Sequence, residues 1–350
     1  MVIRDFRETC SKDRPLVGGK GASLGELTRA GVNVPPGLIV TTTAFEQFMA
    51  SIDIDGAIRR LITALDPNDL PALTASTAAV RQQIEHAPLP RNVEQSILEA
   101  HAALTQGEHD APVAVRSSAT SEDSAAASFA GLQDTFLWIR GADSVVRSVR
   151  ACWASLYSTE SVSYRLRLEL PEHQVSMGVI VQQMVESVCS GVMFTRSPTT
   201  GDRSVIAIEG SWGLGSCIVS GEVTPDRFVV SKVTGEISKR TISDKRVQHV
   251  PQHGSSGVRA AAVPAEQQSS ACLTDEQIRT LAQTGQQIEQ HYGAPQDIEW
   301  AVGGRAHALF ILQSRPETVW ARREARPVAT PKARAFEHVF ALLGDRDRTP

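Results

Sequence analysis

The chain has 350 residues, of which 41% are hydrophobic and 21% are charged, and its formal net charge at pH 7 is −4. This length suits two domains, or one large domain with two lobes, and the composition excludes wholesale disorder, a coiled coil and a collagen-like chain. With so small a net charge, and only 5 Trp, 3 Tyr and 10 Phe, the sequence gives no global case for binding nucleic acid or an anionic membrane.

Hydrophobic periodicity predicts an alternation of helices and strands. Residues 91–104 and 143–157 each place apolar side chains on one helical stripe, and capping boxes at Thr43–Glu46 and Thr274–Gln277 predict two further helix starts. Strands are predicted at Val113–Arg116, Val179–Gln182, Gly191–Thr195, Val205–Ile208, Arg227–Val230, Ile298–Trp300 and Leu309–Leu312. The short strands between 179 and 230, separated by turn residues, favour antiparallel sheet, so the fold class is α+β.

Two stretches are predicted to lack packed structure. Residues 251–272 are rich in Ser, Ala, Gln and Gly and are expected to form a surface loop. Residues 320–334 combine prolines with a run of basic residues that includes Arg322, Arg323 and Arg326. That second stretch is either a solvated tail or an arm that docks on a partner.

The cysteines indicate a reducing compartment. They are Cys10, Cys152, Cys189, Cys217 and Cys272, an odd number, and no two are close enough for a metal knuckle. The first residues carry acids and no apolar run, which is unlike a signal or transit peptide. No apolar run approaches the roughly 18–20 residues of a membrane helix. We therefore expect a soluble, cytoplasmic protein.

The first stretch with chemical content is the glycine-rich segment that contains Lys20. Glycines at 18, 19 and 21 would let backbone N–H groups approach phosphate oxygens while the ammonium group supplies charge. The spacing of the nucleotide-binding P-loop is absent. A glycine turn that enters an ordinary helix would have the same sequence, so this segment alone decides nothing.

A predicted strand ends at Arg116 and is followed by a cluster of hydroxyl residues. An arginine at a strand end suits bidentate phosphate binding, although it could equally form a salt bridge with Glu122 or Asp123. Further on, Gly131 and Thr135 belong to a short segment that suits either a small lid over a nucleotide or a tight turn.

The last predicted strands carry the groups that suit a metal. If the segments around Glu299 and Gln313 are neighbouring strands, a carboxylate and an amide oxygen face one point, and both are hard ligands suited to Mg²⁺. Arg315 shares the face of Gln313 because side chains alternate along a strand. Earlier in the chain, Gln182 interrupts an apolar strand, and its amide either contacts an adenine edge or lies on the polar face of a sheet.

Taken together, these segments resemble one family: the N-terminal nucleotide-binding part of phosphoenolpyruvate synthase, pyruvate phosphate dikinase and rifampin phosphotransferase. The resemblance runs from about Leu16 to Thr318. It is densest at VGGKGASLGEL, GVNVPPGL, AVRSSATSEDS, SFAGLQDTFL, VQQMV, GVMFTRSP, SWGLG, SGEVTPDRFVV, PQDIEW and ILQSRPETV. The resemblance implies an ATP-grasp fold in which two α+β lobes clasp ATP. The lobes are expected at residues 1–175 and 176–319, with a basic tail at 320–350.

The resemblance also implies roles for individual residues. Lys20, Arg116 and Arg315 would bind or act on the ATP phosphates. The residues expected to line the nucleotide are Gly131, Thr135 and Gln182, and those expected to hold Mg²⁺ are Glu299 and Gln313. One departure is visible, because many relatives carry glutamate after the GLG turn where this chain has Ser216. The details of that loop are therefore open.

The resemblance implies a phosphoryl acceptor as well. Family members continue into a domain whose phosphorylatable histidine stands in a Thr-Ser-His turn, and none of the nine histidines here stands in such a turn. We therefore expect the ATP-binding subunit of a split phosphotransferase. It would cleave ATP to AMP and phosphate and pass the β-phosphoryl group to a histidine on a separate partner protein.

Phenylphosphate synthase, which phosphorylates phenol, has such a split arrangement, and one of its subunits resembles this chain. The final acceptor would be phenol or pyruvate. Two alternatives stay open at this point. One is a self-sufficient ATP-grasp kinase that phosphorylates a small molecule directly. The other is a non-enzymatic module that senses ATP.

Overall fold

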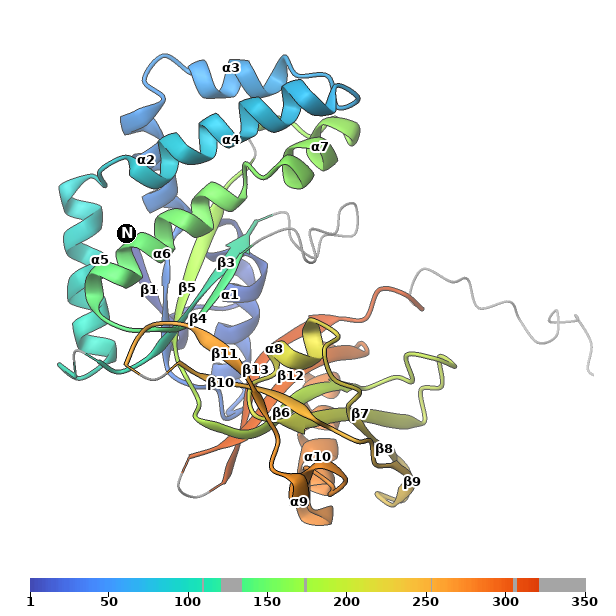
Figure 1. Cartoon of the computed structure of the whole chain (residues 1–350). Coiled ribbons are helices and arrows are strands. Elements are labelled where there is room, and N and C mark those ends of the chain that lie inside the picture. Colours follow the sequence, from blue (N-terminus) through green and yellow to red (C-terminus); the bar gives the residue numbers. More distant parts are fainter. Residues whose placement is uncertain (109, 121–133, 173–174, 253, 305–306, 321–350) are drawn as a thin grey trace, which may run out of the picture. The chain divides into compact units, whose positions relative to one another are not determined.

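The computed structural model describes most of the chain. The described residues are 1–108, 110–120, 134–172, 175–252, 254–304 and 307–320. The chain divides into two units, Met1–Glu317 and Thr318–Pro350, and every element named below belongs to the first. The basic residues of the expected tail, Arg322, Arg323 and Arg326, lie outside the described residues. Helices and strands are both abundant, which confirms the α+β prediction (Figure 1).

The described part of the first half of the chain is built on a five-stranded antiparallel sheet with the order β1-β2-β5-β3-β4. Its strands are β1 (Ile3–Asp5), β2 (Gly37–Val40), β3 (Val113–Ala119), β4 (Thr135–Ile139) and β5 (Met177–Gln183). The three central strands are buried along nearly their whole length, so helices must cover both faces.

Alternation along the strands assigns each face to its own core. On β5, Val179 and Val181 join one apolar cluster, whereas Ile180 joins another with Val17 and Leu24 of α1 (Arg14–Arg29). The first cluster is closed by α2 (Thr42–Ile52), α3 (Ala57–Thr63), α4 (Leu70–His86), α5 (Arg91–Leu104), α6 (Ala142–Ser155) and α7 (Thr159–Arg167). Helix α1 is therefore the element that covers the opposite face.

A second antiparallel sheet has the order β13-β12-β6-β7-β8-β9 among the described residues. Its strands are β6 (Ser187–Phe194), β7 (Val205–Trp212), β8 (Asp226–Ser231), β9 (Ile237–Thr241), β12 (Gln296–Gly303) and β13 (Ala308–Pro316). Helix α10 (Asp275–Tyr292) packs Ile278, Leu281 and Ile288 into the core of this sheet around Trp300. The remaining elements are the short helices α8 (Ser216–Val219) and α9 (Ala265–Gln268) and a strand pair, β10 (Val247–Pro251) and β11 (Val258–Ala262). The 3₁₀ turns are η1 (Phe6–Glu8) and η2 (Ser11–Asp13).

Several local predictions meet a clear outcome. The capping box at Thr274 is present, but the one at Thr43 is wrong, because α2 begins at Thr42 with Thr41 as its cap. The expected loop at 251–272 is also wrong in part, since it contains β11 and α9. Strand β5 lies at the centre of the first sheet. By sheet membership, therefore, the chain passes from one half to the other at residues 184–186, beyond the expected boundary at 175.

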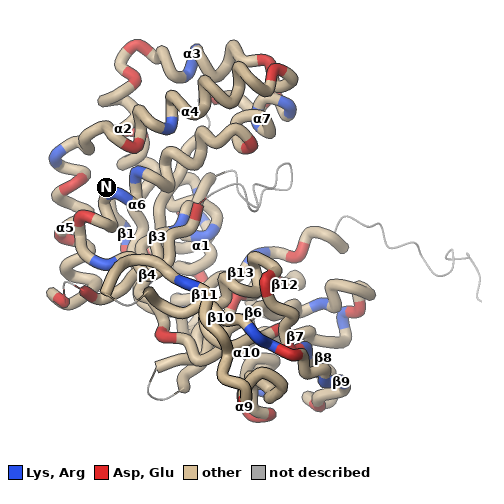
Figure 2. Tube along the Cα trace, viewed as in Figure 1, with Lys and Arg blue, Asp and Glu red and all other residues tan. Residues whose placement is uncertain are grey.

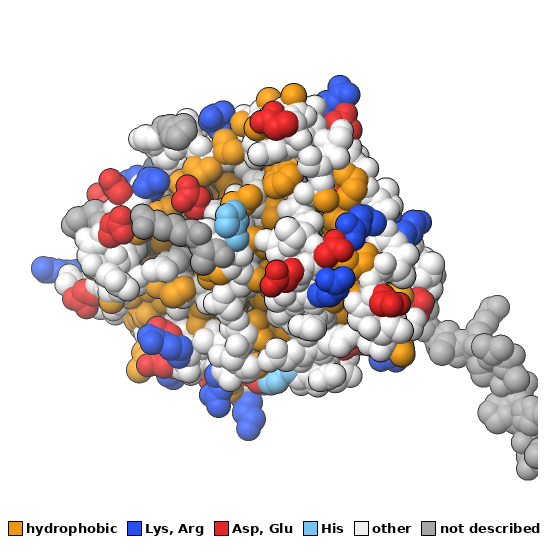
Figure 3. Space-filling model, turned by 90° about the horizontal axis from the view of Figure 1, so that it is seen from below, with side chains coloured by type: hydrophobic (Ala, Val, Ile, Leu, Met, Phe, Trp, Pro, Cys, Tyr) orange, Lys and Arg blue, Asp and Glu red, His pale blue; other side chains and the backbone are white. Residues whose placement is uncertain are grey.

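Charged residues of both signs are interspersed along the helices of the first half (Figure 2). On the face seen in Figure 3, hydrophobic side chains lie among charges of both signs. Among the described residues, no helix combines the length and the apolar composition that a membrane span requires.

Candidate functional site

The lysine of the glycine-rich segment lies on α1, just past a break in the helix. Gly18 has φ +74°, and a side chain there would place a Cβ atom 1.9 Å from the carbonyl oxygen of Ser118. Only glycine permits this approach of α1 to β3. Two residues on, the Lys20 ammonium group donates a hydrogen bond to the Ser117 carbonyl at 3.1 Å. The glycines therefore bring the lysine to the strand that carries Arg116.

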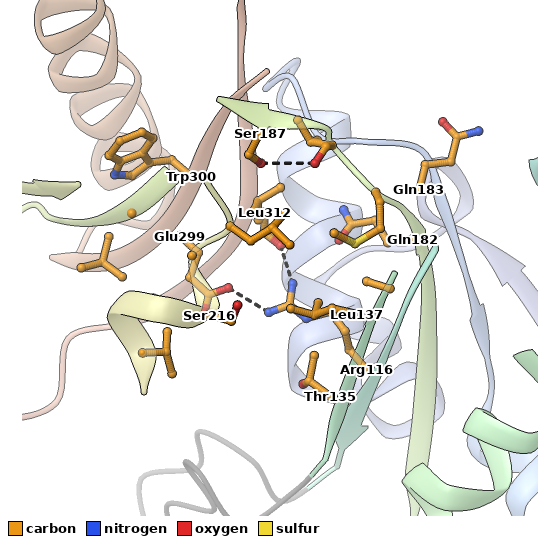
Figure 4. A pocket seen from close by; sticks show the side chains of 18 residues that line it. Arg116, Thr135, Leu137, Gln182, Gln183, Ser187, Ser216, Glu299, Trp300 and Leu312 are labelled. Carbon is orange, nitrogen blue, oxygen red and sulfur yellow. Dashed lines mark hydrogen bonds and ion pairs between the residues drawn. The ribbon is translucent and has the colours of Figure 1, made fainter. Parts of the chain in front are cut away.

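Arg116 joins the two sheets. Its side chain leaves β3 on the face that α1 covers, and it donates to the Leu312 carbonyl at 3.0 Å and to Glu299 Oε2 at 2.9 Å. The Nη2 atom that contacts Glu299 also donates to Gln313 Oε1. Arg116 is 8% exposed, so the guanidinium group itself is largely removed from water. Figure 4 shows it reaching from β3 toward Glu299.

The register of β12 and β13 brings the expected metal ligands together. Glu299 lies directly opposite Gln313, and Asp297 lies opposite Arg315 one pair further along the same face. A register shift follows Glu299, and it leaves Leu312 as an extra residue on β13 before pairing resumes between Trp300 and Ile311. Glu299, Gln313 and Arg315 therefore share one face of the sheet, as expected. On that face Arg315 contacts Asp297, with 3.4 Å between Arg315 Nε and Asp297 Oδ2.

These strands line a pocket of about 260 Å³ between the two sheets. Its walls are mainly apolar, and its polar side chains include those of Arg116, Thr135, Gln182, Ser216 and Glu299. Gln182 is 3% exposed, and its side-chain amide donates to the Pro35 carbonyl at 3.2 Å. An apolar slot with a few convergent polar groups is the usual form of a small-molecule site.

The predicted site residues fall into three groups. Arg116, Thr135, Gln182 and Glu299 line the pocket, and Gln313 joins them through its contact with Arg116. Lys20 contacts the neighbouring Ser117 carbonyl and is not among the lining residues, and neither is Arg315, whose side chain is 43% exposed. Gly131 lies outside the described residues. The roles assigned to these residues stay predictions.

Sequence reasoning missed part of the pocket. The apolar wall includes Leu137, Met184, Val192, Leu214 and Leu312. Asp297, the partner of Arg315, was missed although the alternation that placed Gln313 with Arg315 would also have placed Asp297 with Glu299. Ser216 was noted only as a departure, yet its side chain lines the pocket.

Comparison with known proteins gives a consistent result. The family model described as "Pyruvate phosphate dikinase, AMP/ATP-binding domain" matches residues 14–335. The chain is 42% identical over 315 residues to a probable phosphoenolpyruvate synthase of Methanothermobacter thermautotrophicus, covering 89% of this chain and 45% of that protein. It is 41% identical over 332 residues to the phosphoenolpyruvate synthase of Escherichia coli, covering 91% of this chain and 42% of that protein. The chain thus spans less than half the length of these relatives.

Among solved structures, D-alanyl-alanine synthetase A of Vibrio cholerae aligns with 85% of this chain and 58% of its own. The sequences are 10% identical and the TM-score is 0.29, so no argument about this chain rests on that alignment.

Proposed function

This chain belongs to the family of the pyruvate phosphate dikinase AMP/ATP-binding domain, and from that premise we propose that it is an ATP-dependent phosphotransferase module of the ATP-grasp type. ATP would lie in the pocket between the two sheets, with its base against the apolar wall and near the Gln182 amide. Thr135 would contact the nucleotide from β4, and Gly131 would do so from the segment before it. The phosphates of ATP would lie toward Arg116 and Lys20.

The observation that carries this proposal is the position of Arg116. A single guanidinium group from the first sheet meets Glu299 and Gln313 of the second. Phosphoryl transfer depends mainly on positioning and on neutralising charge, and a planar guanidinium group suits both tasks. An arginine at the junction of the two sheets supports this proposal, because it would bind a phosphate that lies between them.

The donor atoms fit Mg²⁺. Glu299 Oε2 and Gln313 Oε1 both accept from the same nitrogen of Arg116, so the two oxygens converge on one cationic atom. A carboxylate and an amide oxygen are hard ligands, and Mg²⁺ at a phosphate site usually takes few protein ligands. When bound, the metal would neutralise phosphate charge. Arg116 would then turn from these oxygens toward the phosphates, and Arg315 would add positive charge along the same face of β13.

We also propose the finer reaction that the sequence suggests. ATP would be cleaved to AMP and phosphate, and the β-phosphoryl group would pass to a histidine on a separate carrier protein. The absence of a Thr-Ser-His turn among the nine histidines of the sequence supports an acceptor other than these residues. The relatives are phosphoenolpyruvate synthases, which favours pyruvate over phenol as the final acceptor.

The test uses ATP labelled separately at the β and γ positions, with a phosphohistidine carrier domain supplied in trans. The expected result is AMP in solution and acid-labile label on the carrier, arising only from the β position. Label arising only from the γ position, with ADP as the product, would contradict the dikinase reaction. Rapid phosphorylation of pyruvate or phenol without a carrier would favour a self-sufficient kinase. ATP binding without any turnover would favour a sensor.

A further inference from the structure

A chain of hydrogen bonds leads out of the pocket through Ser216. The Ser216 hydroxyl lies 2.8 Å from Nδ1 of His249, and the other ring nitrogen, Nε2, lies 3.2 Å from Oε2 of Glu222. The three residues come from the start of α8, from β10 and from the turn that follows α8. A hydroxyl, an imidazole and a carboxylate in this order form the arrangement by which serine nucleophiles are activated.

The backbone fixes this arrangement. The Leu214 N–H donates to the His249 carbonyl at 2.9 Å, which attaches β10 to the glycine turn before α8. Gly213 has φ +74°, and a Cβ atom there would lie 2.5 Å from the same carbonyl oxygen, so the close approach requires glycine. Ser216 and His249 are therefore held together by main-chain contacts that do not depend on their side chains.

The hydrogen-bond partners determine where the protons lie. The pKa of the Glu222 carboxyl is below its usual range because the Ser220 hydroxyl, and then His249, donate to it. An ionised carboxylate only accepts, so His249 Nε2 carries the hydrogen that it donates to Glu222. In the neutral imidazole Nδ1 is then an acceptor, and the Ser216 hydroxyl donates to it. The Ser216 hydroxyl is therefore hydrogen-bonded to a nitrogen, His249 Nδ1, that can accept its proton.

We propose that Ser216 is a nucleophile that takes the γ-phosphoryl group of ATP bound in the pocket, which makes this residue a self-phosphorylation site. The inference rests on the proposed function in one respect, that ATP binds in this pocket. A bond forms between Ser216 Oγ and the γ-phosphorus, and the bond from that phosphorus to the oxygen bridging the β- and γ-phosphates breaks. The hydroxyl proton passes to His249 Nδ1, and ADP leaves. Glu222 is a positioning residue that orients the ring and stabilises its charged form.

Other nucleophiles near the pocket are less suited. The Ser187 hydroxyl also lines the pocket, but it donates to the Val185 carbonyl, which is too weak a base to take its proton. Cys217 lies within 4.8 Å of His249 and Glu222, yet it is fully buried and does not line the pocket, and burial raises the pKa of its thiol. A phosphate on Ser216 would add about −1.5 to −2 charges to the pocket that Glu299 lines, which would weaken ATP binding.

The test incubates the purified chain with Mg²⁺ and ATP labelled at the γ position, followed by intact-mass and peptide mass spectrometry. We expect one acid-stable phosphate on Ser216, at a rate per molecule that does not change with protein concentration. Ser216→Ala should abolish it, and the control Ser238→Ala, at an exposed serine of β9 that does not line the pocket, should retain it. Phosphate at Ser211 or Ser220 of the same peptide, with none at Ser216, would overturn the proposal.

The base is tested by chemical rescue. His249→Ala should slow phosphorylation by about 10²-fold or more, and added imidazole should restore part of the rate, which it would not do for a structural role. Glu222→Ala should also slow the reaction, and Glu222→Asp should recover it in part. An undiminished rate in His249→Ala, or a defect that imidazole leaves unchanged, would overturn the assignment of the base.

Calorimetry with ATP on the same preparation separates the two proposals. ATP binding without phosphate on Ser216 would overturn this inference and leave the proposed function standing. No ATP binding would overturn both. The labels also differ chemically, because a phosphoserine on this chain is stable to acid and derives from the γ position, whereas the phosphohistidine expected on the carrier is acid-labile and derives from the β position.

Discussion

Two ion pairs, each with its carboxylate on the second sheet, differ in how completely they are enclosed. Lys245 and Asp226 are both fully buried, with 2.7 Å between Nζ and Oδ1. The lysine also donates to the carbonyls of Ser243 and Gln268, and the aspartate accepts the backbone N–H groups of Ser243 and Cys272. The further hydrogen-bond partners of this pair are all backbone groups of the chain, and both charged side chains are closed off from solvent.

The pair of Arg116 and Glu299 is open on one side. The Arg116 side chain is 10% exposed, but that of Glu299 is 37% exposed and lines the pocket. The acceptors of Arg116 are a backbone carbonyl and two side-chain oxygens of the kind that a metal ion also prefers. The comparison teaches that burial and pairing alone do not mark a functional ion pair. What distinguishes this pair is that Glu299 lines a pocket, and under the proposed function its contact with Arg116 would be exchanged for contacts with a ligand.

The largest expected effect comes from breaking the closed pair. Asp226→Ala would leave a buried lysine charge without its counter-ion, and should lower the free energy of unfolding by about 3–5 kcal/mol. Urea unfolding of the variant and the wild type measures the difference. Replacing both residues with apolar ones should recover only part of the loss, because Asp226 also accepts two backbone N–H groups. A loss below about 1 kcal/mol would show that the pair is not the structural element described here.

Breaking the open pair should instead affect turnover. Arg116→Ala should reduce phosphoryl transfer by about 10²–10³-fold, equivalent to roughly 3–4 kcal/mol of transition-state stabilisation, with a smaller loss of stability than Asp226→Ala. The matched control is Arg227→Ala, which removes an exposed arginine that pairs with Glu209 on the second sheet. Arg315→Ala should also lose activity if the family role applies. Near-normal turnover in Arg116→Ala would make that residue structural.

The sequence predicted elements that local signals determine. The helix at 91–104 matches α5 at both ends, and the cap at Thr274 is present, because both depend on residues close together in the chain. The strands that carry Arg116, Glu299 and Gln313 were predicted from runs of apolar residues.

What the sequence did not provide depends on contacts between distant residues. The contact of Arg116 with Leu312 spans 196 positions, and no local pattern encodes it. The shift that exposes Leu312 to the pocket depends on how two strands pair, and β11 forms in an Ala-rich stretch because β10 offers it a partner. The position of His249 beside Ser216 likewise follows from the attachment of β10 to the glycine turn.

A smaller effect is expected at the metal-binding end of the open pair. Glu299→Gln keeps the shape of the side chain but removes its negative charge, so the concentration of Mg²⁺ needed for half-maximal activity should rise. The rise should be at least the roughly 10–100-fold that changes around metal ligands produce. Titration of activity with Mg²⁺ at saturating ATP measures it, and Glu209→Gln on the exposed pair is the control. An unchanged requirement for Mg²⁺ would remove Glu299 from the metal site.

The smallest effect concerns a pair on the surface, between α1 and α10. Glu26 accepts the Ser11 backbone N–H at 2.9 Å, and its Oε1 atom lies 3.0 Å from Nε2 of His291. These contacts lower the pKa of the Glu26 carboxyl from its ordinary value of 4.5, with the Ser11 hydrogen bond as the larger cause.

A carboxyl whose pKa is lowered by folding stabilises the fold at pH values above its pKa in the unfolded chain. This contribution is lost as the pH falls through its pKa in the folded state. Glu26→Gln should therefore melt at a slightly lower temperature than the wild type at pH 7. The difference should shrink as the pH falls below 4.5. Thermal unfolding of both proteins across this range checks the sign, and a difference that grows toward acid would show that the carboxylate does not stabilise the fold.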